Sequence, residues 1–125
     1  MKSLIPALII LLCVIVITIL GSFFIDSQLE RFSQSIKAYI PSDTTDIMLI
    51  YDGALRIESD YENIKKHLFL FIHDNAVSEI EEHIEEIKSA SRLGEKGDAI
   101  TAKNRLILHI EQLRRFSKFS LEAIV

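Results

Sequence analysis

The chain has 125 residues, of which 49% are hydrophobic and 26% charged, and its net charge is −4 at pH 7. Its 18 acidic residues outnumber 14 basic ones, which disfavours a nucleic-acid-binding protein because such proteins need a clustered basic surface. One cysteine excludes an intrachain disulfide.

The run Leu4–Ile25 is apolar and carries no charge over 22 residues. As a helix it would be about 33 Å long, close to the roughly 30 Å of bilayer hydrocarbon. Secretory signals have a shorter apolar core of about 7–15 residues followed by a small-residue cleavage pattern, which Gly21–Ile25 does not offer. We therefore expect residues 1–25 to be an uncleaved transmembrane anchor in contact with the lipid bilayer through residues 4–25.

The orientation of this anchor has to be argued from few charges. Lys2 precedes the run on a three-residue stub, whereas Arg31 and Lys37 follow it. Because so short a head is easily kept inside, we expect a cytoplasmic N-terminus and an extracytoplasmic domain over residues 26–125. That domain carries 13 basic and 18 acidic residues, a net charge of −5.

Apolar residues continue at helical spacing beyond the anchor, at Leu29, Phe32, Ile36, Tyr39 and Ile40. No glycine or proline separates this stripe from the run, so we expect one helix to leave the membrane and end before Pro41. The stripe could be a coiled-coil seam, but it is short, and packing on the rest of the domain is favoured.

Two further helices are predicted on either side of a break at Ser59–Asp60. The first, from Asp46 to Glu58, would place Ile47, Met48, Tyr51 and Leu55 inward. The second, from Tyr61 to His73, contains five consecutive apolar residues at 68–72, including Phe69 and Phe71, and should therefore be central.

A fourth helix is predicted over 76–93, with an apolar face at Val77, Ile80, Ile84, Ile87 and Ala90. Gly94 and Gly97 would end it. Asp98 would cap a fifth helix that reaches Phe116, with an apolar face at Ala99, Ala102, Leu106, Ile110, Leu113 and Phe116. The apolar tail after Phe116 should fold back on the domain.

When the sequence is aligned with itself at an offset of 38 residues, Asp60 aligns with Asp98, Lys65 with Lys103 and Leu68 with Leu106. This indicates a repeated helix–turn–helix unit, although chance similarity between amphipathic helices is the alternative. The predicted fold class is therefore all-α, with an N-terminal transmembrane helix followed by an antiparallel bundle of two helical hairpins.

Several local patterns accompany the span: Asp60-Tyr61-Glu62, the apolar run 68–72 before His73-Asp74, Gly97-Asp98, and a closing Ser-Leu-Glu-Ala-Ile at 120–124. With these features the chain resembles the small membrane-anchored helical proteins of Gram-positive spore-forming bacteria grouped as domain of unknown function 4363. Two departures are the absence of tryptophan near the central run and the reversed order of the His73-Asp74 pair. The resemblance implies a bacterial membrane protein and brings no activity or catalytic residue.

The sequence contains no motif for catalysis, a cofactor or a metal. Its histidines, at 67, 73, 83 and 109, lack the spacing of zinc or di-iron ligands and are interpreted as ordinary helix residues. The acidic run Glu79, Glu81, Glu82, Glu85 and Glu86 is interpreted as a solvated helix face, with a cation site as the alternative. We therefore expect no enzyme, no cofactor and no metal.

The remaining candidate is an interaction surface at the end of the last helix, formed by Arg114, Arg115, Phe116 and Phe119. The basic residues also suit a helix C-terminus, where they complement the macrodipole. The leading hypothesis is an accessory module that binds another membrane or envelope protein, or itself. The alternative is a ligand-sensing helical bundle that signals through a membrane partner.

Overall fold

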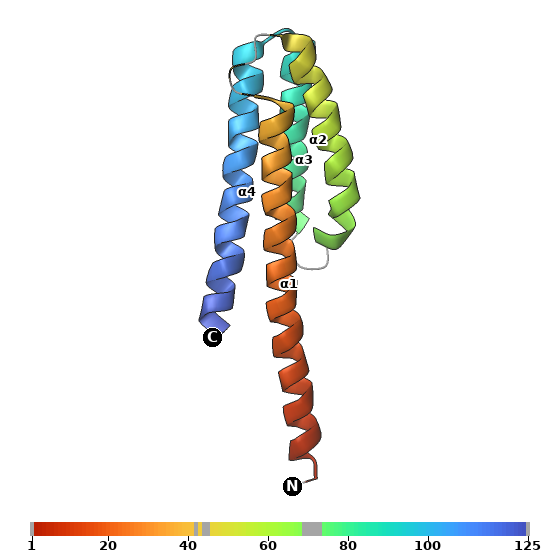
Figure 1. Cartoon of the computed structure of the whole chain (residues 1–125), viewed down its shortest axis with the longest axis vertical. Helices are drawn as coiled ribbons and strands as arrows, with labels where there is room; N and C mark the ends of the chain where they lie inside the picture. The colour runs from red at the N-terminus through yellow and green to blue at the C-terminus, as the bar shows by residue number, and fades with distance from the viewer. Residues whose placement is uncertain (1, 42, 44–45, 69–73, 125) are drawn as a thin grey trace.

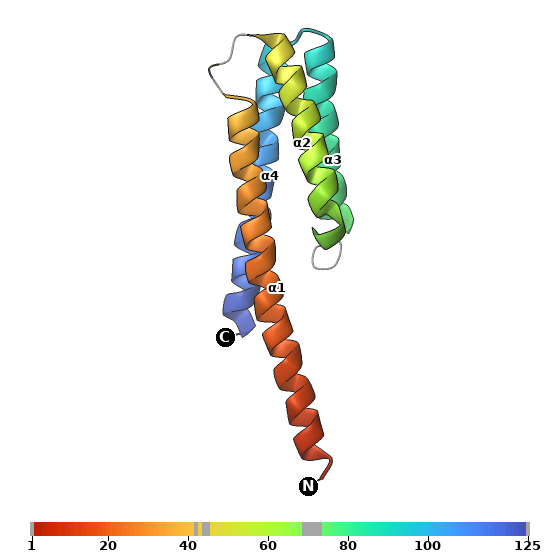
Figure 2. The same ribbon diagram turned by 45° about the vertical axis from the view of Figure 1, so that its right-hand side comes forward.

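The computed structural model describes residues 2–41, 43, 46–68 and 74–124, without the side chains of 74 and 117–124. This part of the chain forms four α-helices and no strand: α1 (Leu4–Tyr39), α2 (Ile47–Leu68), α3 (Asp74–Arg92) and α4 (Lys96–Ile124). Helices α1 and α3 run in one direction and α2 and α4 in the other (Figures 1 and 2). Helix α1 packs against α2 and α4, and α3 packs against the same two helices.

The predicted continuation of the apolar run into the domain is confirmed, because α1 is one uninterrupted helix of 36 residues. Its N-terminal part projects beyond the other three helices (Figure 1). Its second half carries the expected stripe, with Leu29, Phe32 and Ile36 buried. The helix ends two residues before Pro41, which disfavours helical geometry in the residue before it.

The predicted break at Ser59–Asp60 is wrong, since α2 passes through both residues without interruption. The first of the two expected hairpins therefore does not exist. Asp60 does not cap a helix, and its carboxylate instead accepts a hydrogen bond of 2.8 Å from the Tyr39 hydroxyl on α1. A polar residue such as Asp60 can therefore lie in the middle of a helix when a neighbouring helix supplies its hydrogen-bond partner.

The predicted inward face of α2 is only partly right, since Ile47 packs against the core and Tyr51 is half-buried. Met48 and Leu55 are exposed (64% and 40%), whereas the buried stripe runs through Ile50, Ala54, Ile57, Tyr61 and Leu68. The spacing of 4, 3, 4 and 7 residues is that of a single helical face. Phe69 and Phe71 lie outside the described residues.

Gly53 lies where α2 crosses the end of α1. A Cβ atom added there would come within 2.6 Å of Ile40 Cγ1 and 2.7 Å of the Tyr39 carbonyl oxygen. The glycine therefore permits a close approach of the two helices.

The predicted inward face of α3 is confirmed, with Val77, Ile80, Ile84, Ile87 and Ala90 all buried. The helix ends in a Schellman motif. Gly94 has a φ of 73°, and the amides of Gly94 and Glu95 donate to the carbonyls of Ser91 and Ala90.

Two predictions for the last helix are wrong. Helix α4 begins at Lys96, so Asp98 lies in its first turn and is not its N-cap. The helix also continues beyond Phe116 to Ile124, and Phe116 is 71% exposed instead of facing the core. The inward positions Ala99, Ala102, Leu106 and Ile110 are buried as expected.

Candidate membrane span and interaction surface

The first part of α1 exposes an unusual amount of apolar surface. Its large apolar side chains are 39–64% exposed, at Leu4, Ile5, Leu8, Ile9, Ile10, Leu11, Leu12, Val14, Val16, Ile17, Leu20, Phe23 and Phe24. Among the described residues, α1 is the helix long and apolar enough to cross a membrane. Surface of this extent in contact with water would be strongly unfavourable.

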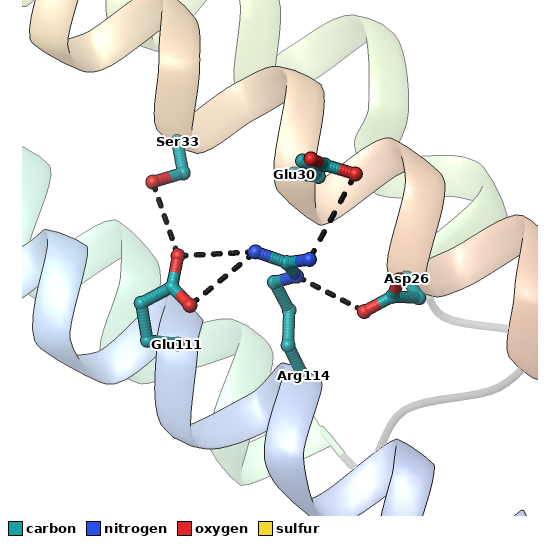
Figure 3. Close-up of polar contacts among 5 residues, drawn as sticks. All are labelled: Asp26, Glu30, Ser33, Glu111 and Arg114. Atoms are coloured by element: carbon teal, nitrogen blue, oxygen red, sulfur yellow. Dashed lines mark hydrogen bonds and ion pairs between the residues drawn. The ribbon is translucent and has the colours of Figure 1, made fainter.

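Arg114 joins α4 to α1 directly after this apolar run (Figure 3). Its Nε lies 3.0 Å from Asp26 Oδ1, and its terminal nitrogens lie 3.8 Å from Glu30 and 3.3 Å from Glu111. The hydroxyl of buried Ser33 is 3.5 Å from Glu111 Oε1. The hydrogen bond with Asp26 raises the pKa of Arg114 above its already high ordinary value, so the guanidinium stays charged.

The four residues of the predicted interaction surface have different environments. Arg114 is only 17% exposed and is engaged within the molecule. Arg115 and Phe116 are exposed. Phe119 belongs to α4, but its side chain lies outside the described part. Within this set, Arg115 and Phe116 remain available for contact with a partner.

Sequence reasoning did not find the partners of Arg114, because Asp26 is 88 residues away along the chain. The spacing of Asp26 and Glu30, one helical turn apart just after the apolar run, was the available signal.

A second polar cluster joins α2 to α3. The Tyr61 hydroxyl lies 3.1 Å from the Val77 carbonyl and 3.2 Å from Glu81 Oε1, and it can donate to one of them at a time. Lys65 Nζ lies 2.7 Å from the same Glu81 oxygen. Burial, together with the Glu81 charge, raises the pKa of Tyr61, so the hydroxyl remains protonated as a donor.

The acidic run on α3 is largely exposed, as predicted for a solvated face, and several of its carboxylates also lie near basic groups. Glu81 meets Lys65, Glu85 meets Lys88 at 3.1 Å, and Glu79 lies 3.3 Å from His109. His83 lies 3.7 Å from Glu86, and its ring centroid is 5.7 Å from that of His109. In the part of the chain that the structure describes, no three His, Cys, Asp or Glu side chains are grouped so that they could hold a metal ion.

Lys103 is a buried cation that the sequence did not reveal as one. It is 2% exposed, and its Nζ donates a 3.1 Å hydrogen bond to the Ile40 carbonyl at the end of α1. Burial lowers the pKa of Lys103. A cation at a helix C-terminus is favoured by the macrodipole, so the residue holds the end of α1 against α4.

Clefts lined by described residues lie at the edges of helix pairs. A cleft of about 190 Å³ between α2 and α3 is lined mainly by charged residues, among them Glu58, Lys65 and Glu81. One of about 180 Å³ lies between α1 and α2, and one of about 310 Å³ lies between α3 and α4. Drug-sized ligands usually occupy mostly apolar pockets of about 300–1,000 Å³.

The chain matches no family model, no curated protein and no solved structure at a significant level. The function therefore has to be argued from the fold and from these surfaces.

Proposed function

We propose that the protein is a single-pass, membrane-anchored accessory module at the bacterial cell envelope, with an antiparallel helical body that acts by binding and not by catalysis. The observation that carries this proposal is the apolar surface of α1. Most of its large side chains between Leu4 and Phe24 are exposed, although the same helix continues into a buried core. A bilayer is the environment that removes such a surface from water.

Retention of the anchor is supported by the continuity of α1. Ile25 and Leu29 are 2% and 0% exposed and belong to the same helix as the apolar run. Cleavage after Gly21 would cut this helix within its regular hydrogen-bonded structure.

We further propose that the N-terminus is cytoplasmic and that residues 26–125 are extracytoplasmic, with Lys2 on the cytoplasmic side of the apolar run. A Leu93→Cys variant tests this, because Leu93 is 73% exposed beyond the end of α3. In a Cys13→Ser background, a membrane-impermeant thiol reagent should label it in whole cells. Labelling only after lysis would place the domain in the cytoplasm.

The proposed partner is another membrane or envelope protein, or a second copy of the chain. Helix α2 begins and α3 ends at the end of the bundle away from the span (Figure 1), and apolar side chains are exposed there. Met48 is 64% exposed, Leu49 55% and Leu93 73%. Apolar groups so exposed gain free energy when a partner covers them.

Purification in mild detergent tests this binding role. A paired Met48→Ser, Leu49→Ser change should abolish association with the co-purifying protein or with a second copy, without altering the melting temperature. Leu108→Ser, at a 54% exposed position on α4, is the matched control and should retain the association. A wild-type protein that is monomeric and purifies alone would contradict the accessory role.

The cleft between α2 and α3, at about 190 Å³, is smaller than a usual pocket for a drug-sized ligand, and this favours the proposal over ligand sensing at that cleft. The cleft between α2 and α3 is charged, and its Glu81 and Lys65 are already paired with each other. The resemblance to domain of unknown function 4363 is consistent with a small anchored helical protein and adds no chemical role.

A further inference from the structure

We propose that α4 is a second membrane-contacting element, and that its last turns lie beside α1 within the lipid leaflet on the domain side. The inference rests on the proposed role of Leu4–Ile25 as the membrane span. Under this proposal the end of the helical domain nearest the span is embedded in the bilayer, and the domain does not lie entirely outside it.

The first step is the level at which α4 meets the span. Arg114 Nε lies 3.0 Å from Asp26 Oδ1, and Asp26 is the first residue after the apolar run. Helix α4 continues from there to Ile124. At 1.5 Å per residue these ten residues extend about 15 Å further. Because α1 and α4 run in opposite directions, α4 descends along the apolar run and ends well before its beginning (Figures 1 and 2).

The second step is the burial pattern of the run. Gly21 and Ile25 are buried, and between 15 and 22 a stripe on the same side is half-buried, at Ile15, Thr18, Ile19 and Ser22. On the opposite side, Ile17 and Leu20 are 62% and 63% exposed. The part nearer the N-terminus has no covered side, since every residue from 4 to 14 is exposed. Helix α4 runs beside this half of the run (Figures 1 and 2), and we attribute its covered face to α4.

The third step compares lengths. The uncovered part, residues 4–14, is about 16 Å long as a helix, roughly half of the hydrocarbon thickness. A span therefore has to include the covered half as well. The end of α4 then lies at the same depth as the covered half of α1. Its backbone groups are hydrogen-bonded within the helix except for the last four carbonyls, which need partners from water or headgroups.

The composition of this end of α4 is mainly apolar, although Glu122 lies about 12 Å along the helix from Arg114. Residues 116–124 read FSKFSLEAI, with Lys118 and Glu122 as the charged members among mainly apolar ones. Charged groups are costly at the bilayer centre and much less so near the headgroups. Phe116, 71% exposed, follows Arg114 on α4, and Phe23, 61% exposed, precedes Asp26 on α1, so both rings lie near the boundary fixed by this ion pair.

Fluorescence quenching by nitroxide-labelled lipids tests the inference with the full chain in phosphatidylcholine–phosphatidylglycerol vesicles. Single cysteines at Phe116, Leu121, Leu108, Leu93 and Leu12, in a Cys13→Ser background, carry an environment-sensitive probe. A headgroup nitroxide should quench the probe at Phe116, and a shallow acyl-chain nitroxide should quench the one at Leu121. Leu108, which lies above Arg114 on α4, and Leu93 should lose no fluorescence with either lipid.

The probe at Leu12 separates this inference from the proposed function. Quenching at Leu12 by a deep acyl-chain nitroxide, without any quenching at Phe116 and Leu121, would leave the anchor intact and overturn the role of α4. Quenching of the Leu121 probe by the headgroup nitroxide alone would place α4 on the membrane surface. That result would also contradict the proposed insertion of α4 into the leaflet. A blue-shifted Phe116 probe that no labelled lipid quenches would indicate a protein partner or a second copy in place of lipid. An unquenched Leu12 would instead contradict the anchor.

Discussion

Gly53 shows how one residue controls the approach of two helices. Alanine is favoured over glycine in a helix interior by about 0.8–1.0 kcal/mol, but here its Cβ would lie 2.6 Å from Ile40 Cγ1 and 2.7 Å from a backbone oxygen. Because overpacking costs about 1–3 kcal/mol, Gly53→Ala should lower the free energy of unfolding. Thermal unfolding in mild detergent, followed by circular dichroism, measures this.

Gly97 on α4 provides the matched control, because a Cβ there would meet nothing within 4 Å and its φ is not positive. Gly97→Ala should therefore leave stability unchanged or raise it by up to about 1 kcal/mol. Equal effects of the two changes would contradict the close crossing of α1 and α2.

Lys88 gives a pH-dependent prediction. Its Nζ lies 2.8 Å from Glu58 on α2 and 3.1 Å from Glu85, and the hydrogen bond with Glu58 raises the pKa of the lysine. A raised folded-state pKa means that the stabilisation is complete below the unfolded value, about 10.5, and is lost as the pH rises through the folded value.

The Lys88→Met variant should therefore be less stable than the wild type at pH 7, by about 0.5–1 kcal/mol for a partly exposed pair. The difference should narrow above the ordinary lysine pKa. Lys66→Met, at an exposed position of α2, should change stability by less than about 0.5 kcal/mol at either pH. A constant deficit across this range would show that the lysine stabilises α2 and α3 through packing and not through its charge.

At the scale of helices, Arg114 is the main polar connection between α4 and α1. Removing its charge leaves the carboxylates of Asp26, Glu30 and Glu111 close together without a cation (Figure 3). Arg114→Met should therefore cost about 1–3 kcal/mol in chemical unfolding, less than a fully buried pair. Arg115→Met, at the exposed neighbouring position, should cost less than about 0.5 kcal/mol.

Adding Asp26→Asn to the Arg114 variant should restore part of this loss, because it removes one of the unpaired charges. A double variant whose loss equals the sum of the two single losses would show that the residues are not coupled.

The helices also show which parts of the fold the sequence could predict. The inward face of α3 was predicted correctly because its apolar residues recur at helical spacing between clear end signals, with Gly94 at the C-terminus. The break in α2 was predicted wrongly from Ser59 and Asp60. The structure instead gives Asp60 a partner, Tyr39, which no local pattern reveals.

The candidate surfaces were predictable to different degrees. The apolar run is one contiguous stretch of the chain, so the order of residues alone was enough to identify it. The pairing of Arg114 with Asp26 depends on the packing of helices from opposite ends of the chain, so Arg114 appeared in the sequence to be a free basic residue. The end of α4 was expected to fold back because it is apolar, but it continues as a helix to Ile124, and neither glycine nor proline interrupts it.

At the scale of the whole molecule, α1 belongs to two environments at once. Leu4–Val14 are exposed on all sides, whereas Leu29 and Ile36 on the same helix are completely buried in the bundle core. If the span is retained, any tilt of α1 in the membrane moves the core helix with it, since the structure contains no break between them. A cleaved span would instead release the body from the bilayer.

The central claim is therefore that the apolar run remains part of the mature protein and anchors it. The most direct measurement is the intact mass of the protein recovered from cell membranes after extraction with alkaline carbonate. We expect the protein to stay in the membrane pellet, with a mass that includes Leu4–Ile25. A protein that alkaline carbonate releases, or a mature chain that begins after Gly21, would contradict the claim.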